Sequence, residues 1–151
     1  GALSRYKVLL FLWGAVVEKS TLERIDKWVR DGGVLVYCPR NRGNLLTVEG
    51  DATISNRWLS GDTGKGKVIA YGGEVIPARA FSEYVHDLLL KTPGLHPRTL
   101  AALKMKKPDT VYWSVLDNGR LALLNFSARP ATVQLATGKV ITIPPHEPYV
   151  E

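Results

Sequence analysis

The sequence predicts an α/β protein in which a small three-layer parallel sheet with flanking helices precedes a small antiparallel β-unit. In the first half, continuous apolar runs alternate with amphipathic segments of helical period. In the second half, strand-like segments of period two follow one another between tight turns. Thr92-Pro93-Gly94 lies between them and combines residues that end helices and form loops. We therefore expect two domains, over 1–94 and 95–151.

The first half begins with a strand–helix–strand unit. Tyr6–Trp13 is a continuous apolar run, as expected for a strand covered on both faces in a parallel sheet. Ser20–Glu23 matches a capping box, which predicts a helix N-terminus there. Gly32-Gly33 ends this helix, and Val34–Tyr37 is the next buried strand. These elements predict a right-handed β-α-β crossover. The buried face of the helix is expected to carry Leu22, Ile25, Trp28 and Val29.

The rest of the first half contains one long irregular segment, one strand and one helix. The segment from Cys38 to Gly66 is rich in Gly, Asn, Asp and Arg and is expected to be irregular. Lys67–Tyr71 is a third strand, and Pro77–Leu90 is a second amphipathic helix.

The second half is expected to form an antiparallel meander. Thr110–Leu116 and Arg120–Phe126 flank Asn118-Gly119, a pair that favours a tight hairpin turn. Ala131–Leu135 and Lys139–Ile143 follow as two more strands. Leu100–Met105 is either a further strand or a short helix. Three prolines are expected to end the strand pairing: Pro144, Pro145 and Pro148.

Composition and charge exclude several classes of protein. The chain has 151 residues, 45% of them hydrophobic and 23% charged, which indicates a soluble globular protein and excludes disorder and a disulfide scaffold. The longest apolar run, Val8–Val17, is about half of the roughly 20 residues that span a bilayer, and it lacks the features of a signal peptide. The net charge of +6 raises nucleic acid as a partner. However, the basic residues are scattered apart from Lys104, Lys106 and Lys107, so we expect neither a nucleic-acid nor a membrane partner.

One segment has the pattern of a phosphate-binding loop. Gly61–Lys67 (GDTGKGK) satisfies G-x-x-x-x-G-K, in which Ser or Thr should come next to hold Mg²⁺. Val68 stands there instead, and a strand rather than a helix is expected to follow. We interpret the segment as a glycine-rich turn and expect no nucleotide or other cofactor.

Catalytic and metal-binding groupings are not recognisable. Cys38 follows a predicted parallel strand, where α/β sheets place their ligands, but Pro39 comes next and no helix starts there. We therefore interpret Cys38 as structural. The three histidines lack metal-ligand spacing, and the carboxylates form no acid–base pair. Asn125-Phe126-Ser127 fits the glycosylation sequon but ends a predicted strand.

The remaining candidate for a ligand or partner surface combines tryptophan with arginine. Trp13 and the Arg40–Arg42 stretch are both expected near the carboxyl edge of the parallel sheet. Arginine offers planar donors and tryptophan an apolar face, which together suit sugars or a protein partner. The alternative is ordinary packing of arginines over tryptophan rings. The candidate residues are Trp13, Arg40, Asn41, Arg42 and Trp58.

The segment 6–39 (YKVLLFLWGAVVEKSTLERIDKWVRDGGVLVYCP) resembles the class I glutamine amidotransferase-like, flavodoxin-like domains of some glycoside hydrolases, the β-galactosidase trimerisation region above all. Gly64–Ile69 is similar to a Gly-x-Gly segment of those domains, and LALLNFSARPATVQL with GKVITIPPHE is similar to the small β-domain that follows. The resemblance implies an accessory region, because the catalytic carboxylates of those hydrolases lie on a separate barrel. True amidotransferases need a cysteine at a nucleophile elbow, which this chain lacks.

A flavodoxin-like domain has about five parallel strands, and we find three. Missing strands would leave an unpaired apolar edge. Gly1 in place of an initiator Met fits a domain cut from a longer polypeptide. We therefore expect either a piece of a larger hydrolase-like polypeptide or a homo-oligomer.

Three functions follow from these expectations. The first is a non-catalytic accessory role in interdomain packing or oligomerisation within a glycoside-hydrolase-like protein, which would be secreted or periplasmic if that protein degrades polysaccharides. The second is a carbohydrate-binding module in which Trp58, Tyr112 or Trp113 stacks on sugar rings. The third is a hydrolase or amidotransferase that uses Cys38.

Overall fold

The computed structural model describes residues 2–12, 15–38, 45–73, 75 and 78–151. The chain divides into two compact units, Gly1–Val85 (unit 1) and His86–Glu151 (unit 2). Unit 1 is built on parallel strands and unit 2 on antiparallel strands, so the predicted fold class is confirmed. None of the described helices is long and apolar enough to cross a membrane.

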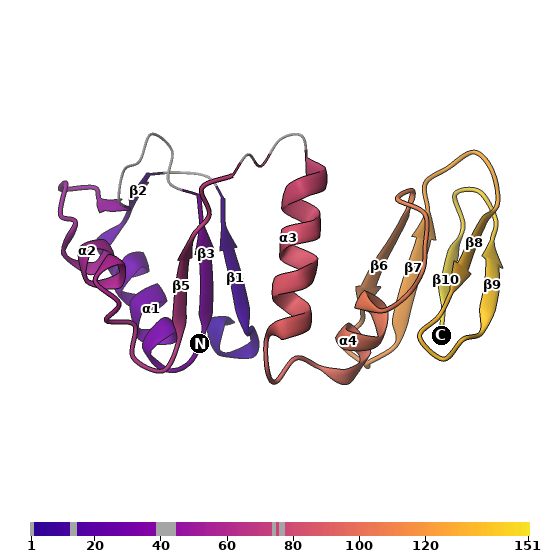
Figure 1. Cartoon of the computed structure of the whole chain (residues 1–151), viewed down its shortest axis with the longest axis horizontal. Helices are drawn as coiled ribbons and strands as arrows, with labels where there is room; N and C mark the ends of the chain where they lie inside the picture. The colour runs from indigo at the N-terminus through magenta and orange to yellow at the C-terminus, as the bar shows by residue number, and fades with distance from the viewer. Residues whose placement is uncertain (1, 13–14, 39–44, 74, 76–77) are drawn as a thin grey trace. The chain divides into compact units, whose positions relative to one another are not determined.

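Unit 1 contains a three-stranded parallel sheet in the order β1-β3-β5 (Figure 1). The strands are β1 (Val8–Phe11), β3 (Val34–Tyr37) and β5 (Lys67–Ala70), each inside or equal to a predicted strand. The helix α1 (Lys19–Arg30) connects β1 to β3, as predicted. A short 3₁₀ helix, η1 (Ala2–Arg5), precedes β1.

The four apolar residues predicted for the buried face of α1 are all at most 8% exposed. At the end of the helix, Gly32 has φ +115°, its N–H donates to the Val29 carbonyl (2.9 Å), and the Gly33 N–H donates to the Trp28 carbonyl (3.0 Å). This pair of bonds is the Schellman arrangement that Gly-Gly permits. Trp28 covers Gly33 so closely that a Cβ there would lie 2.3 Å from the indole.

The predicted capping box is wrong. The helix begins at Lys19, with Glu18 at the N-cap position and no side-chain cap. Strand β2 (Val16–Val17) pairs with β4 (Leu46–Thr47), and Val17 is buried. Because the pairing of β2 ends at Val17, the chain turns into the helix before it reaches Ser20.

The expectation of an irregular segment from Cys38 to Gly66 is also corrected, because its described part contains β4 and the helix α2 (Thr53–Leu59). The Asp51 carboxylate accepts hydrogen bonds from the Thr53 N–H (2.8 Å) and from the Thr53 hydroxyl (2.5 Å) at the helix start. The buried Ser55 hydroxyl donates to the Leu45 carbonyl (2.7 Å), and Trp58 is buried. Tertiary contacts therefore hold this short polar helix.

The helix α3 (Ala78–Lys91) nearly coincides with the predicted second amphipathic helix. Within unit 1, the Tyr71 ring lies 5.0 Å from that of Phe81 and 4.7 Å from that of Tyr84. These ring contacts join the first turns of α3 to the end of β5. Farther along, the Thr92 hydroxyl donates to the Leu88 carbonyl (2.8 Å) where the helix ends.

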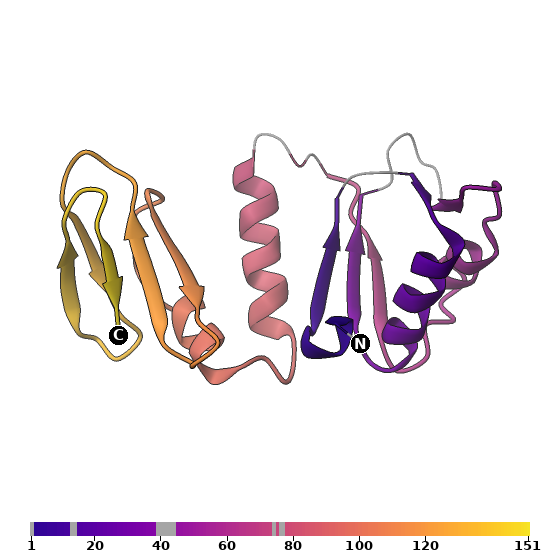
Figure 2. The same cartoon turned by 180° about the vertical axis from the view of Figure 1, so that it is seen from behind.

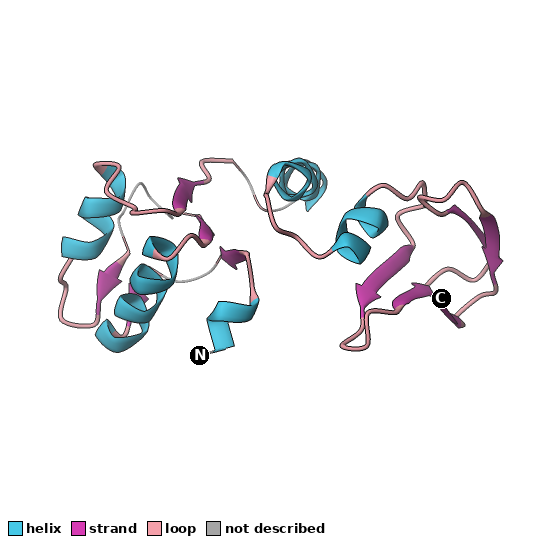
Figure 3. Ribbon diagram, turned by 90° about the horizontal axis from the view of Figure 1, so that it is seen from below, coloured by secondary structure: helices cyan, strands magenta, loops and turns pink. Residues whose placement is uncertain are grey.

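Unit 2 begins with the helix α4 (Pro97–Leu103), so the helical alternative for Leu100–Met105 is the one observed over most of that segment. Its β-strands form two sheets, β10-β7-β6 and β8-β9 (Figures 1 and 2). Helix α4 packs beside β6 (Figure 3). The strands are β6 (Val111–Val115), β7 (Leu121–Asn125), β8 (Ala131–Gln134), β9 (Val140–Ile143) and β10 (Pro148–Val150).

The predicted single meander is therefore wrong: β7 pairs with β10 rather than with β8. The expectation that proline ends the pairing fails at Pro148, which is the first residue of β10 and lies opposite Leu124. Proline is tolerated at the first residue of an edge strand, because the missing N–H need not face the ladder.

Candidate functional site

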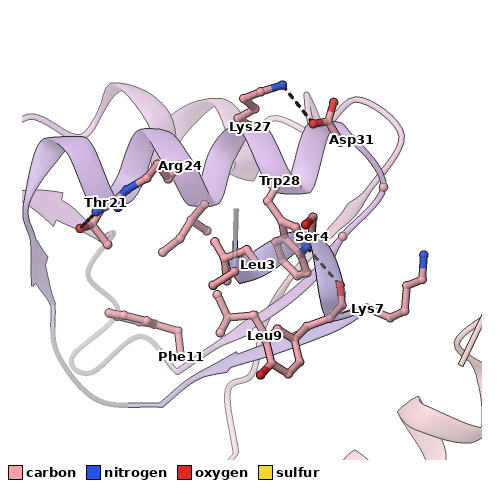
Figure 4. Close-up of a pocket in the computed structure, with 15 residues that line it drawn as sticks. Leu3, Ser4, Lys7, Leu9, Phe11, Thr21, Arg24, Lys27, Trp28 and Asp31 are labelled. Atoms are coloured by element: carbon pink, nitrogen blue, oxygen red, sulfur yellow. Dashed lines mark hydrogen bonds and ion pairs between the residues drawn. The ribbon is translucent and has the colours of Figure 1, made fainter. Parts of the chain in front are cut away.

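A groove of about 780 Å³ lies between η1, β1 and α1 in unit 1 (Figure 4). The indole N–H of Trp28 donates to the Tyr6 carbonyl (3.2 Å), which fixes the segment between η1 and β1 against the helix. Figure 4 shows an apolar interior and a polar rim, along α1 and at the start of β1. The apolar lining comprises Leu3, Leu9, Phe11, Ile25 and Trp28, and the polar rim comprises Lys7, Thr21, Arg24, Lys27 and Asp31.

Cys38 directly follows β3 and is partly buried. Burial raises the pKa of its thiol, which keeps the thiol protonated at neutral pH. A cysteine nucleophile needs the opposite, a site that stabilises the thiolate. The described surroundings of Cys38 thus support the structural interpretation.

Alkylation of Cys38 should therefore be slow in the folded chain. Because the thiolate is the reacting form and Cys38 is the single cysteine, iodoacetamide should label the folded chain a few-fold more slowly at pH 8 than the chain unfolded in urea. The folded-state rate should keep rising above pH 8.5, the pKa of an ordinary thiol. Mass spectrometry measures both rates, and faster labelling of the folded chain would contradict the prediction.

The three histidines have local structural roles. His86 Nε2 lies 2.8 Å from the Leu103 carbonyl, His96 Nδ1 accepts from the Arg98 N–H (3.2 Å) at the start of α4, and the His146 N–H donates to the Asn125 carbonyl (2.9 Å). Within the described ranges, no three His, Cys, Asp or Glu side chains lie close enough together to hold a metal ion.

The glycine-rich segment packs against the end of α1. A Cβ on Gly66 would lie 2.0 Å from the Val29 carbonyl oxygen, and one on Gly64 would lie 2.9 Å from the Arg30 Cα. The Lys65 N–H donates to the Arg30 carbonyl (3.1 Å), and β5 starts at Lys67. These glycines allow close backbone approach, and a strand follows them as predicted.

Of the sequence-predicted surface residues, four lie outside the described residues: Trp13, Arg40, Asn41 and Arg42. Trp58 is only 4% exposed, and its indole N–H donates to Asp26 (2.7 Å). A ring this deeply buried has no free face for a sugar, so the stacking role expected for Trp58 does not fit the structure.

The partner of Trp58 is the buried member of a charge network whose other members are partly exposed. Asp26 is 8% exposed and also binds Arg57 of α2, while Arg30 lies 3.4 Å from it. Arg30 in turn pairs with Asp62 (2.8 Å), and the hydrogen bond to Asp62 raises the pKa of Arg30. The network links α1, α2 and the segment before β5, so its role is structural.

Unit 2 presents an apolar sheet surface, which we call the outer face. Tyr112 is 62% exposed and Phe126 is 57% exposed, and their rings meet edge to face at 5.1 Å. Trp113 lies on the opposite side of β6, packed against the core of unit 2. By strand register and alternation, the outer face consists of Tyr112, Ser114, Ala122, Leu124, Phe126, Pro148 and Val150.

Sequence reasoning named Tyr112 but not Phe126 or the face as a whole. The alternation of β6 and β7 could have indicated which residues share a side. The residues that β10 adds to the outer face could not have been predicted from alternation, because the pairing of β10 with β7 was not predicted. Asn125, the first residue of the sequon, is 0% exposed and so is closed to glycosylation in the folded chain.

No protein-family model matches the sequence, and no curated protein matches it. Several solved structures resemble its fold, among them the following three. Gan42B, a GH42 beta-galactosidase, has a TM-score of 0.62 and 17% identity over 98% of this chain. A catalytic mutant of Gan42B from G. stearothermophilus has a TM-score of 0.61 and 17% identity over 97%. The apo exo-carrageenase GH42 from Bacteroides ovatus has a TM-score of 0.55 and 14% identity over 95%.

The chain spans about a third of Gan42B (32%) and about a fifth of the carrageenase (21%). Because the sequence identity to these enzymes is only 14–17%, the comparison shows a similar fold and nothing further. The fold of this chain therefore resembles one region of GH42 enzymes.

Proposed function

We propose that the chain is a non-catalytic accessory region of a larger glycoside-hydrolase-like protein, where it serves interdomain packing or oligomerisation. The observation that carries this proposal is the extent of the fold likeness. It covers 95–98% of this chain but only 21–32% of each GH42 enzyme. The flavodoxin-like and amidotransferase-like character of unit 1 is part of the proposal, supported by three parallel strands and the α1 crossover.

The chemistry of the described residues supports a role without catalysis. The Cys38 thiol has a raised pKa, the described carboxylates and histidines form no metal-binding group, and the glycine-rich segment packs on α1. The outer face supports packing: its strand residues are uncharged, and its two aromatic rings are more than half exposed. Exposed apolar surface of this kind marks protein interfaces.

The activity of the chain tests the proposal directly. Purified chain should not hydrolyse nitrophenyl β-galactoside or other nitrophenyl glycosides above the rate of a blank. Turnover that copurifies with the chain and disappears in Cys38→Ala would instead support the cysteine-dependent hydrolase, and turnover of any kind would contradict the non-catalytic role.

The outer face should drive association of the chain. We expect wild-type chain to self-associate with rising concentration in sedimentation velocity, and Tyr112→Ser/Phe126→Ser to remain monomeric, because the substitution removes the two most exposed rings of the face. Both side chains are exposed, so the free energy of unfolding should change by about 0.5 kcal/mol or less for each.

Val48→Ser/Leu59→Ser is the matched control. Val48 (65% exposed) and Leu59 (56%) are as exposed as the aromatic pair but belong to unit 1 and are not part of the outer face. This variant should self-associate like wild type. Equal association of all three proteins would remove the outer face from the proposal.

A second candidate function, carbohydrate binding, is favoured by the exposed pair Tyr112 and Phe126. Aromatic faces stack on sugar rings through apolar contact. Calorimetric titration with galacto-oligosaccharides should then give binding that Tyr112→Ala abolishes. If wild type gives no heat of binding while Tyr112→Ser/Phe126→Ser loses self-association, the packing role is favoured over this one.

A further inference from the structure

Strand β1 is an outer strand of its sheet, with β3 on one side and no strand on the other among the described residues. The Lys7 carbonyl accepts from the Val34 N–H (2.9 Å), and the Phe11 carbonyl accepts from the Cys38 N–H (3.3 Å). Residues 7, 9 and 11 thus direct their main-chain groups toward β3. Because these groups alternate along a strand, Val8 and Leu10 direct theirs to the open side.

The groove lies beside this open edge. Leu9 and Phe11 of β1 contribute to its apolar lining together with Ile25 and Trp28 of α1. On the opposite face of the sheet, Leu10 is 38% exposed. A strand added next to β1 would therefore find main-chain partners at the edge and apolar surface on both faces for its alternate side chains.

The rim of the groove is positively charged. Lys27 and Asp31 neutralise each other in an ion pair of 3.1 Å. Asp31 is the single carboxylate among the described lining residues, so Lys7 and Arg24 have no lining carboxylate of their own to pair with. The Arg24 guanidinium donates to two neutral acceptors, the Ser20 carbonyl and the Thr21 hydroxyl, both at 3.1 Å. The groove therefore carries two uncompensated positive charges at its rim.

We infer that this groove and the open edge of β1 bind an extended acidic polypeptide segment, which adds to the sheet as a fourth strand. Charge complementarity favours this partner over a second copy of the chain, since a second copy would bring the same basic rim and a net charge of +6 to the contact. A small apolar ligand would leave the main-chain groups of Val8 and Leu10 unpaired. The inference rests on the proposed packing role, which it deepens by naming a surface and its partner.

A synthetic peptide tests the inference. The probe is a short fluorescein-labelled peptide in which a run of valines is flanked by glutamates, and fluorescence anisotropy measures its binding to the full chain. We expect saturable binding, and we expect the amide exchange of Val8 and Leu10 to slow on binding in NMR spectra. A peptide with lysine in place of glutamate should bind about tenfold more weakly or not at all. N-methylation of every residue of the run, which removes the N–H donors of both peptide edges, should abolish binding.

Protein variants locate the site. Lys7→Glu/Arg24→Glu should weaken binding of the glutamate peptide about tenfold. The control Lys104→Glu/Lys139→Glu changes the net charge equally at exposed positions in unit 2 and should bind like wild type. Circular dichroism confirms that each variant is folded. Equal affinity for the two peptides or for the two variants, or binding that N-methylation leaves unchanged, would overturn the inference, as would the absence of binding.

The other occupants give distinct results. Self-association of wild-type chain that Lys7→Glu/Arg24→Glu abolishes, while Tyr112→Ser/Phe126→Ser does not, would overturn the inference in favour of a second copy. Glycosidase turnover would contradict the proposed function without changing peptide binding. Conversely, if the chain shows neither glycosidase turnover nor peptide binding, only the inferred addition of a strand to β1 is contradicted.

Discussion

Alanine at Gly66 should destabilise unit 1 by about 3 kcal/mol or more. The added Cβ would lie 2.0 Å from the Val29 carbonyl oxygen and 2.4 Å from the Gly33 carbonyl oxygen. Both atoms are backbone, so a side-chain rotation cannot relieve the overlap. Either the end of α1 or the start of β5 must move, and with it the bond from the Lys67 N–H to the Gly33 carbonyl (3.0 Å).

Gly72→Ala is the matched control for Gly66→Ala. A Cβ on Gly72 would meet no atom within 4 Å, and its φ is not positive, so stability should change by less than about 1 kcal/mol. Native-state amide exchange separates the two units: Gly66→Ala should speed exchange at Leu35 in unit 1 and leave that at Val133 in unit 2 unchanged. Equal stability of both variants would show that the close packing of Gly66 on α1 is not required.

The same close approach explains why glycines occur in the segment that matches the phosphate-loop pattern. The spacing of Gly61–Lys67 satisfies a phosphate-binding motif, but Gly64 and Gly66 are small because α1 lies against them. Sequence alone could discount the motif, since Val68 and the strand pattern after it contradict phosphate binding. The sequence could not show that the carbonyl oxygens of Val29 and Gly33 leave no room for a side chain at Gly66.

Long elements of regular hydrophobic period were predictable, and elements held by tertiary contacts were not. The buried face of α1 and the strand Val34–Tyr37 follow from local patterns. In contrast, α2 is short and polar, and its buried Trp58 bonds to Asp26 on α1, 32 residues earlier. Strand β10 begins at a proline and depends on a non-local partner, β7. No local pattern encodes these partners.

The candidate surfaces also differ in whether local sequence patterns or contacts distant in sequence determine them. Tyr112 was a candidate for stacking on sugar rings, and the structure leaves it exposed. Trp58 was a candidate for the same chemistry, but a partner distant in sequence buries it. The groove could not be predicted, since it depends on how η1 and α1 flank β1.

In unit 2, the buried polar centre is Asn125, which is 0% exposed. Its side-chain N–H groups donate to the carbonyls of Arg129 (2.8 Å), Ile143 (3.1 Å) and Pro144 (3.2 Å). Its side-chain oxygen accepts from the Ser127 N–H (3.0 Å) and from the Ser127 hydroxyl (2.8 Å). One amide thus joins the end of β7, the following turn and the end of β9.

Asn125→Ala should therefore destabilise unit 2 by about 3–4 kcal/mol, because it removes the side-chain donor shared by the Arg129, Ile143 and Pro144 carbonyls and opens a cavity. Urea unfolding measures the loss, and amide exchange at Val133 should report it within unit 2. Asn118→Ala is the matched control: Asn118 is exposed and accepts one bond, from the Arg120 N–H (3.0 Å), so about 0.5 kcal/mol is expected. If the two variants lost equal stability, the Asn125 side chain could not be the polar centre of unit 2, and the junction of β7 and β9 would have to depend on apolar packing alone.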